Sequence, residues 1–127
     1  MIVEHRAALA ALIGELPFPV HRTVPGDVAE VPCLVLGAPS VGQDSRPGIL
    51  SLTSNIYVIG RRVDVAERDD ELEEMCDMLL IQLGGSHGVM HDNLGFSFET
   101  ATAQTLSIAG VDFPTYVVTV ESSAVTC

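Results

Sequence analysis

The segment ILSLTSNIYVIGRRVDVAERDDELEEMCDMLLIQLGG (Ile49–Gly85) joins a strand pattern directly to a helix pattern. In its first part apolar residues alternate with Ser51, Thr53 and Asn55, which is the period of a strand with one buried face. After Asn55 the residues on both faces are apolar, as is typical of a strand covered on both sides. The sequence therefore predicts a central strand, followed at once by a long helix.

The helix pattern occupies the second part of this segment. Apolar residues recur at helical spacing from Leu72 to Leu83, and Gly84 and Gly85 then supply a C-terminal stop. Asp70, with an acid three residues later, is typical of an N-terminal cap. Acids in a first turn are also favoured by the helix dipole, by about 0.3–1 kcal/mol each. We therefore expect the helix to begin near Asp70.

The rest of the chain adds one helix and several shorter strands. Apolar spacing predicts a helix near residues 3–16, which the prolines at 17 and 19 end. Strands are expected within VHRTV (20–24), CLVLG (33–37), LGFSFETAT (94–102) and TYVVTVES (115–122), with a short piece and a turn in LSIAGVDFP (106–114). The stretches 38–48 and 85–93 are expected to be loops. The fold class is α+β: a mainly antiparallel sheet with two helices packed on it, in one domain spanning 1–127. Strands do not alternate with helices, so parallel winding does not fit.

Composition and charge narrow the function. The 127 residues carry a net charge of −11 and contain no lysine, which argues against a protein that grips nucleic acid. No apolar run approaches the roughly 20 residues that span a bilayer, and the first helix does not resemble a signal peptide. Cys33 and Cys76 lie in apolar runs, so we expect buried free thiols in a reducing compartment.

Residues with catalytic or metal-binding chemistry are sparse. His87 and His91 have a spacing that binds zinc on a helix, with Asp92 beside them, but the surrounding glycines favour a polar loop. No nucleophile, phosphate-binding or dinucleotide motif occurs. We therefore expect no enzyme, cofactor or metal. A small ligand-binding or enzymatic domain is the less favoured alternative.

The long helix carries an unusual outer face. Glu74 and Asp77 lie opposite its core side, as on a solvated surface, yet Met78 and Ile81 lie near the same side. An acidic patch that runs into an apolar one suggests contact with another subunit, and arginines before the helix could pair with acids of a neighbour. The candidate subunit interface comprises Arg61, Arg62, Glu67, Asp70, Glu74, Asp77, Met78 and Ile81.

The order and wording of several segments resemble the tail terminator proteins of long-tailed bacteriophages. After a leading helix come VPGDVAEVPCLVLGAPS (24–40), a long loop, SNIYVIGRR (54–62), the acidic RDDELEEMCDMLLIQL (68–83) and FPTYVVTVES (113–122). The likeness covers roughly residues 3–122. It is one of pattern and segment order, without a catalytic signature.

The resemblance implies a homohexameric ring on the head-proximal end of the tail tube. Such a ring stops tube polymerisation, contacts the tail tube protein and the head–tail stopper or connector, and lets DNA pass through an acidic lumen without specific binding. The resemblance implies a place in the virion, at the tail–head junction, after assembly in the host cytoplasm, with no membrane contact. A head-closure (stopper) or tail-completion protein is the alternative. The long loop is the candidate for docking a partner ring, through Val41, Gln43, Asp44 and Arg46.

Overall fold

A computed structural model describes residues 2–21, 33–37, 39–43, 49–60, 65–85, 88–91, 94–108 and 110–125. The elements in chain order are α1 (Ile2–Ile13), β1 (Val20–His21), β2 (Cys33–Leu36), β3 (Ser40–Gln43), β4 (Ile49–Ile59), α2 (Val65–Gln82), β5 (Val89–His91), β6 (Leu94–Ile108) and β7 (Val111–Val125).

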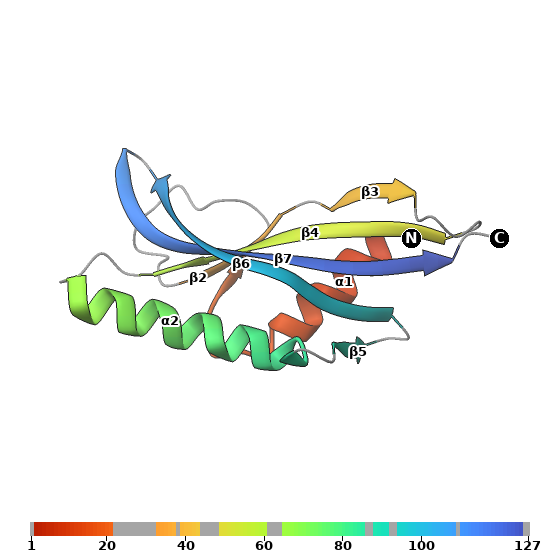
Figure 1. The fold of residues 1–127 in the computed structure, drawn as a ribbon, viewed down its shortest axis with the longest axis horizontal. Helices are drawn as coiled ribbons and strands as arrows, with labels where there is room; N and C mark the ends of the chain where they lie inside the picture. Colours follow the sequence, from red (N-terminus) through yellow and green to blue (C-terminus); the bar gives the residue numbers. More distant parts are fainter. Residues whose placement is uncertain are drawn as a thin grey trace.

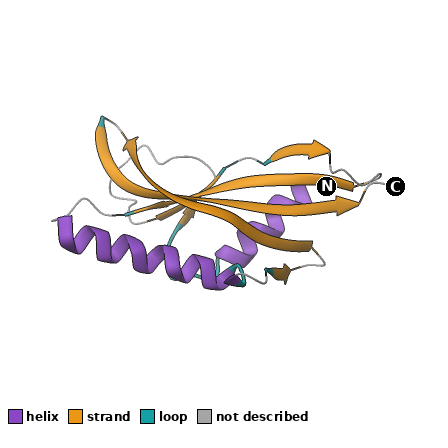
Figure 2. Ribbon diagram, in the orientation of Figure 1, coloured by secondary structure: helices purple, strands orange, loops and turns teal. Residues whose placement is uncertain are grey.

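The strands form one seven-stranded sheet in the order β1-β2-β4-β7-β6-β5, with β3 also pairing with β4. Among the described strands, only β1 and β2 pair in parallel, and the other pairs are antiparallel. Both helices lie on the same face of the sheet (Figures 1 and 2). The predicted α+β class, with a mainly antiparallel sheet and two helices, is confirmed.

The main core lies between the helices and this face of the sheet. Buried residues of α1 and α2 meet those of β4 and β7, because each helix turns one apolar stripe inward. The stripe residues that are at most 5% exposed are Ala8, Leu9, Leu12, Ile13, Leu72, Met75, Cys76, Leu79 and Leu83. The predicted apolar face of the second helix is thus confirmed, and so are the buried cysteines Cys33 and Cys76.

The two-sided burial predicted for the end of β4 is also confirmed. Ile56 and Val58 belong to the core under the helices, whereas Ile59 lies on the other face with Cys33 and Phe113. This end of β4 is flanked by β2 on one side and β7 on the other. Its apolar residues are buried on both faces of the sheet.

The long hairpin of β6 and β7 extends further than the sequence suggested. The stretch expected as a short piece and a turn, 106–114, is regular strand on both sides of a tight connection, with Ile108 opposite Val111. Gly110 in this connection has a φ of 79°, a conformation that favours glycine. Antiparallel pairing continues along both strands, so the hairpin stays extended where its side chains are polar.

Four local predictions were wrong. Residues 40–43, expected in a loop, form β3 against β4, and residues 89–91, expected in a loop, form β5 against β6. The first helix ends at Ile13 rather than near residue 16. Helix α2 begins at Val65, more than a turn before the acid that we expected to cap it, so Asp70 lies inside the helix. Its dense acids therefore mark the body of α2 and not its start.

Candidate interaction surfaces

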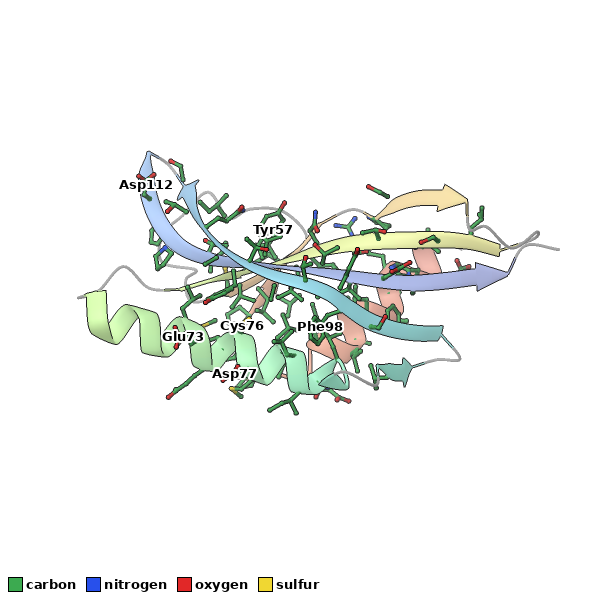
Figure 3. All side chains as sticks on the ribbon, in the orientation of Figure 1. Tyr57, Glu73, Cys76, Asp77, Phe98 and Asp112 are labelled. Carbon is green, nitrogen blue, oxygen red and sulfur yellow. The ribbon has the colours of Figure 1, made fainter. Side chains whose placement is uncertain are left out.

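The outer face of α2 is the first candidate surface. Glu74 and Asp77 are exposed, and beside them Met78 and Ile81 are exposed to 38% and 76%. Figure 3 shows Asp77 on the side of α2 away from the sheet, while Cys76 points toward the sheet. Acids and large apolar side chains thus share one exposed helix face, as the sequence predicted.

The other residues of the predicted interface fall in different places. Arg61 and Arg62 lie outside the described residues, so their pairing with acids of a neighbour stays a prediction. Glu67 and Asp70 lie on α2, within the part whose backbone the structure describes.

The predicted docking loop is partly a strand. Asp44 and Arg46 lie outside the described residues, whereas Val41 and Gln43 belong to β3 at the edge of the sheet. Val41 is 41% exposed. The docking role of this segment stays a prediction, but β3 replaces the unstructured loop on which that prediction rested.

A groove separates α2 from the far part of the β6–β7 hairpin. It has a volume of about 460 Å³, and Leu72 and Glu73 of α2 form one wall. The hairpin forms the other wall with Ala103, Gln104, Thr105, Asp112, Phe113, Pro114, Thr115 and Tyr116. Glu73 and Asp112 are the charged residues of this lining, and both are exposed. The charged side chains that line the groove are therefore both acidic.

Sequence reasoning missed a buried polar cluster at the centre of the fold. His5 of α1 is 1% exposed and hydrogen-bonds through Nδ1 to Ser122 Oγ (2.6 Å) and through Nε2 to Ser54 Oγ (3.2 Å). Its ring lies 5.2 Å from that of Phe96. Burial lowers the pKa of His5, since the charged form loses its hydration. The sequence contains one indication that His5 is buried: it lies four residues before Leu9, on the same face of the first helix.

These hydrogen bonds connect α1 to two strands that are far away in the sequence. The serine hydroxyls come from β4 and β7, and the neutral imidazole can donate to one and accept from the other. The acidic partner that orients the histidine in a hydrolytic triad does not appear in the hydrogen bonds described for this cluster. At 1% exposure, the arrangement is suited to holding the core together.

Burial also affects a second reactive group, the thiol of Cys76. Burial first, and the charge of Asp77 second, raise the pKa of the Cys76 thiol to about 11. Within the described ranges, no three His, Cys, Asp or Glu side chains form a group that could hold a metal ion. His91 of the H-x3-H spacing lies in β5, and His87 lies outside the described residues. Of the described helices, none is both long and apolar enough to cross a membrane.

Comparison with known proteins shows a similarity of fold. No family model matches the sequence, and no curated protein matches it. Among solved structures, a chain from the virion of a native gene transfer agent particle superposes with a TM-score of 0.54 at 21% identity. The match covers 97% of this chain and 92% of that chain. This chain therefore shares, over nearly its whole length, the fold of a chain found in that virion.

Proposed function

We propose that this chain is a structural virion protein that caps the head-proximal end of a phage tail tube as a ring of six copies. The observation that carries the proposal is the whole-length fold likeness to a chain of a virion particle. The order of segments that resembles tail terminators supports the same role. The ring ends tube polymerisation, joins the tail to the head connector and has no catalytic function.

The surfaces of the described residues support a protein that contacts other chains. Ile81 and Met78 are exposed apolar side chains on a helix that otherwise presents acids. Large apolar side chains that gather on one exposed face usually mark a site of contact with another protein. A capping ring also needs a face for the tail tube or the head connector, besides the surfaces that join its copies, and this face of α2 is suited to such a contact.

The charge supports passage of DNA without binding. A net charge of −11, with six arginines and no lysine, disfavours the release of phosphate counterions that drives nonspecific DNA binding. A ring of six copies would carry six times that charge. DNA would then move through its lumen without being held.

The test combines the protein's own mass with its effect on tubes. Native mass spectrometry and negative-stain imaging should show a ring of six copies, in the free protein or after addition of tail tube protein. Adding the protein to polymerising tube protein should shorten the tubes and place one ring at one end. The double substitution Met78→Ser/Ile81→Ser should weaken the effect of the protein on tube length, with Glu74→Ser as the matched control on the same face. Binding to the portal-side adaptor with no effect on tube length would instead indicate a head-closure protein.

A further inference from the structure

We infer that copies of this chain join edge to edge, with the outer edge of β6 in one copy pairing with the outer edge of β3 in the next. The inference rests on the ring of the proposed function and specifies how that ring closes. Both edges belong to the same sheet and lie on opposite sides of β4 and β7 (Figure 1).

The outer edge of β6 is long and largely open. β7 pairs with β6 from Phe96 to Ile108, but on the other side β5 reaches only Leu94–Phe96. Beyond Phe96, no described strand pairs with the outer edge. From Thr100 to Ile108 the sequence contains no charged residue and no proline. Proteins normally protect a free edge with such residues, so an unprotected edge is suited to pairing with another strand.

The register shows which β6 groups face outward. The N–H of Gly60 donates to the carbonyl of Pro114 (2.9 Å), so Pro114 directs its main-chain carbonyl away from β6. Pro114 lies opposite Thr105, which must therefore direct its own N–H and C=O away from β7. Since main-chain direction alternates along a strand, Ala103 and Ser107 do the same. Exposed residues thus offer a row of donors and acceptors along this edge.

The outer edge of β3 is shorter and has the same character. The N–H of Gly37 donates to the carbonyl of Asn55 (2.9 Å), so Asn55 faces the β2 and β3 side of β4. Thr53 shares that direction and lies opposite Ser40, which therefore faces β4. By alternation, Val41 and Gln43 direct their main-chain groups outward. The strand SVGQ carries no charge, so two strongly acidic copies can approach here with little local repulsion.

Strand direction agrees with this pairing. β3 runs antiparallel to β4, β4 to β7, and β7 to β6, so β3 is antiparallel to β6. Within one copy, Val41 lies level with Phe96 and not with Ala103, so the strands must be inclined to the ring axis, as they are in closed sheets. Rotation about such an axis preserves the antiparallel order of the strands. The β3 strand of the next copy then extends the antiparallel sheet of the first, which is a heterologous contact that can close.

The groove beside β6 provides a place for one side chain. Val41 lies opposite Leu52, whose side chain is in the core under the helices, so Val41 is on the helix side of the sheet. The groove lies on that side too, between Leu72 of α2 and the β6–β7 hairpin. Val41 of the next copy would enter this groove next to Ala103. Peptides that add to a sheet edge gain specificity from such side-chain pockets.

Disulfide trapping tests the pairing directly. Val41→Cys/Ala103→Cys, made with Cys127→Ser, should form cross-linked ladders up to six copies on mild oxidation. Neighbouring strands bring Cα atoms within disulfide range. Val41→Cys/Thr102→Cys is the matched control, because Thr102 is exposed on the opposite face and should not cross-link.

A second variant removes one main-chain donor. Ala103→Pro deletes an N–H that faces outward, so pairing with β7 should persist. It should raise the concentration for half-assembly about tenfold per contact, or about 1.4 kcal/mol, whereas Ala103→Ser should not. Matching thermal unfolding of the two monomers would exclude misfolding.

Each outcome decides between the two proposals. A ring that forms without cross-links between positions 41 and 103, and that tolerates Ala103→Pro, overturns the edge pairing and leaves the ring intact. Open cross-linked chains would support the edge pairing and overturn the closed ring. A protein that stays monomeric and uncross-linked even when bound to tail tubes overturns the edge pairing.

Discussion

The buried cluster around His5 makes a quantitative prediction about stability. His5→Ala leaves the hydroxyls of Ser54 and Ser122 without their partner inside the core. An unsatisfied buried polar group costs about 1–3 kcal/mol, and loss of the ring contact with Phe96 adds about 0.5–1.5 kcal/mol. Rotation of the hydroxyls toward other acceptors recovers part of this. We expect a loss of about 3–5 kcal/mol, a large share of the stability of a small domain.

A fully apolar replacement separates lost hydrogen bonds from lost packing. In His5→Leu/Ser54→Ala/Ser122→Ala no polar group remains unsatisfied, and removing all partners together is often nearly neutral. The triple variant should therefore be within about 1–2 kcal/mol of the parent protein.

Urea unfolding followed by far-UV circular dichroism measures both variants, since the chain has no tryptophan. Protein concentrations must be low enough to keep the chain monomeric, and the dependence of unfolding free energy on urea should match between variants. A loss below about 1 kcal/mol for His5→Ala would refute the reasoning. So would a triple variant as unstable as the single one.

Three further predictions concern pH, thiol reactivity and the end of α2. Burial lowers the pKa of His5 in the folded state, so as the pH falls the unfolded chain takes up the proton before the folded one does. The free energy of unfolding should therefore keep its full value above about pH 6.5. Below that pH it should fall, by at most about 1.4 kcal/mol per pH unit, as the pH drops toward the folded-state pKa. His5→Gln should lose that part of the pH dependence, and urea titrations from pH 7.5 to 5 that coincide for both proteins would contradict it. With a pKa of about 11, Cys76 should resist labelling by a maleimide at pH 8 until urea unfolds the chain. Mass spectrometry of peptides cut after glutamate separates Cys76 from Cys127, and labelling of Cys76 at the rate of a free thiol would contradict its burial. Gly84→Ala should lower the stability by at least about 3 kcal/mol, because Gly84 has a φ of 84° and an added Cβ would clash with the carbonyl of Gly88. Gly85→Ala is the matched control: Gly85 has a φ of 58° and open space around it, so this change should cost about 1–2 kcal/mol. Equal melting temperatures of the two variants would show that the turn relaxes.

The parts of the fold that the sequence predicted are those in which hydrophobic periodicity is strong. The end of β4 is apolar on both faces after Asn55, and it is buried on both faces. The apolar stripe from Leu72 to Leu83 predicted the buried side of α2. The opposite side of the helix was predicted to be exposed, and Met78 and Ile81 lie there. Periodicity records which face is buried, so it located the core and one exposed surface.

The parts that it missed depend on main-chain pairing or on single polar contacts. β3 has a single large apolar residue, Val41, and it is a strand because β4 is long enough to pair first with β2 and then with β3. The tip of the β6–β7 hairpin is regular strand because Ile108 pairs with Val111 across the turn at Gly110, and the short alternating runs on either side of that turn were too brief to predict long strands. The cluster around His5 was missed because the hydrogen-bond partners of His5 are 49 and 117 residues away in the sequence. The start of α2 was missed because acids inside a helix resemble acids at its first turn.

The proposed edge pairing also bears on which face of the sheet lines the lumen. A closed ring of inclined strands has the helices on one side of the wall and the helix-free sheet face on the other. The strands β4, β6 and β7 contain no Lys, Arg or His. On the helix-free face, Thr119 donates to Asn55 (3.0 Å) and Ser51 donates to Glu121 (3.2 Å). A wall of internally bonded hydroxyls, amides and acids offers phosphate no cation to bind, so this face is suited to the lumen and α2 to the outside.

Cations placed on each face would test this orientation. In preassembled rings, Asn55→Arg should produce salt-sensitive binding of linear duplex DNA, which can thread a lumen, and none of a closed circle. Asp77→Arg, on the exposed face of α2, should bind linear and circular DNA alike if it binds at all. Threading-dependent binding by Asp77→Arg, with binding of both forms by Asn55→Arg, would place α2 toward the axis. Its acids, and not the polar sheet face, would then be what repels the passing DNA.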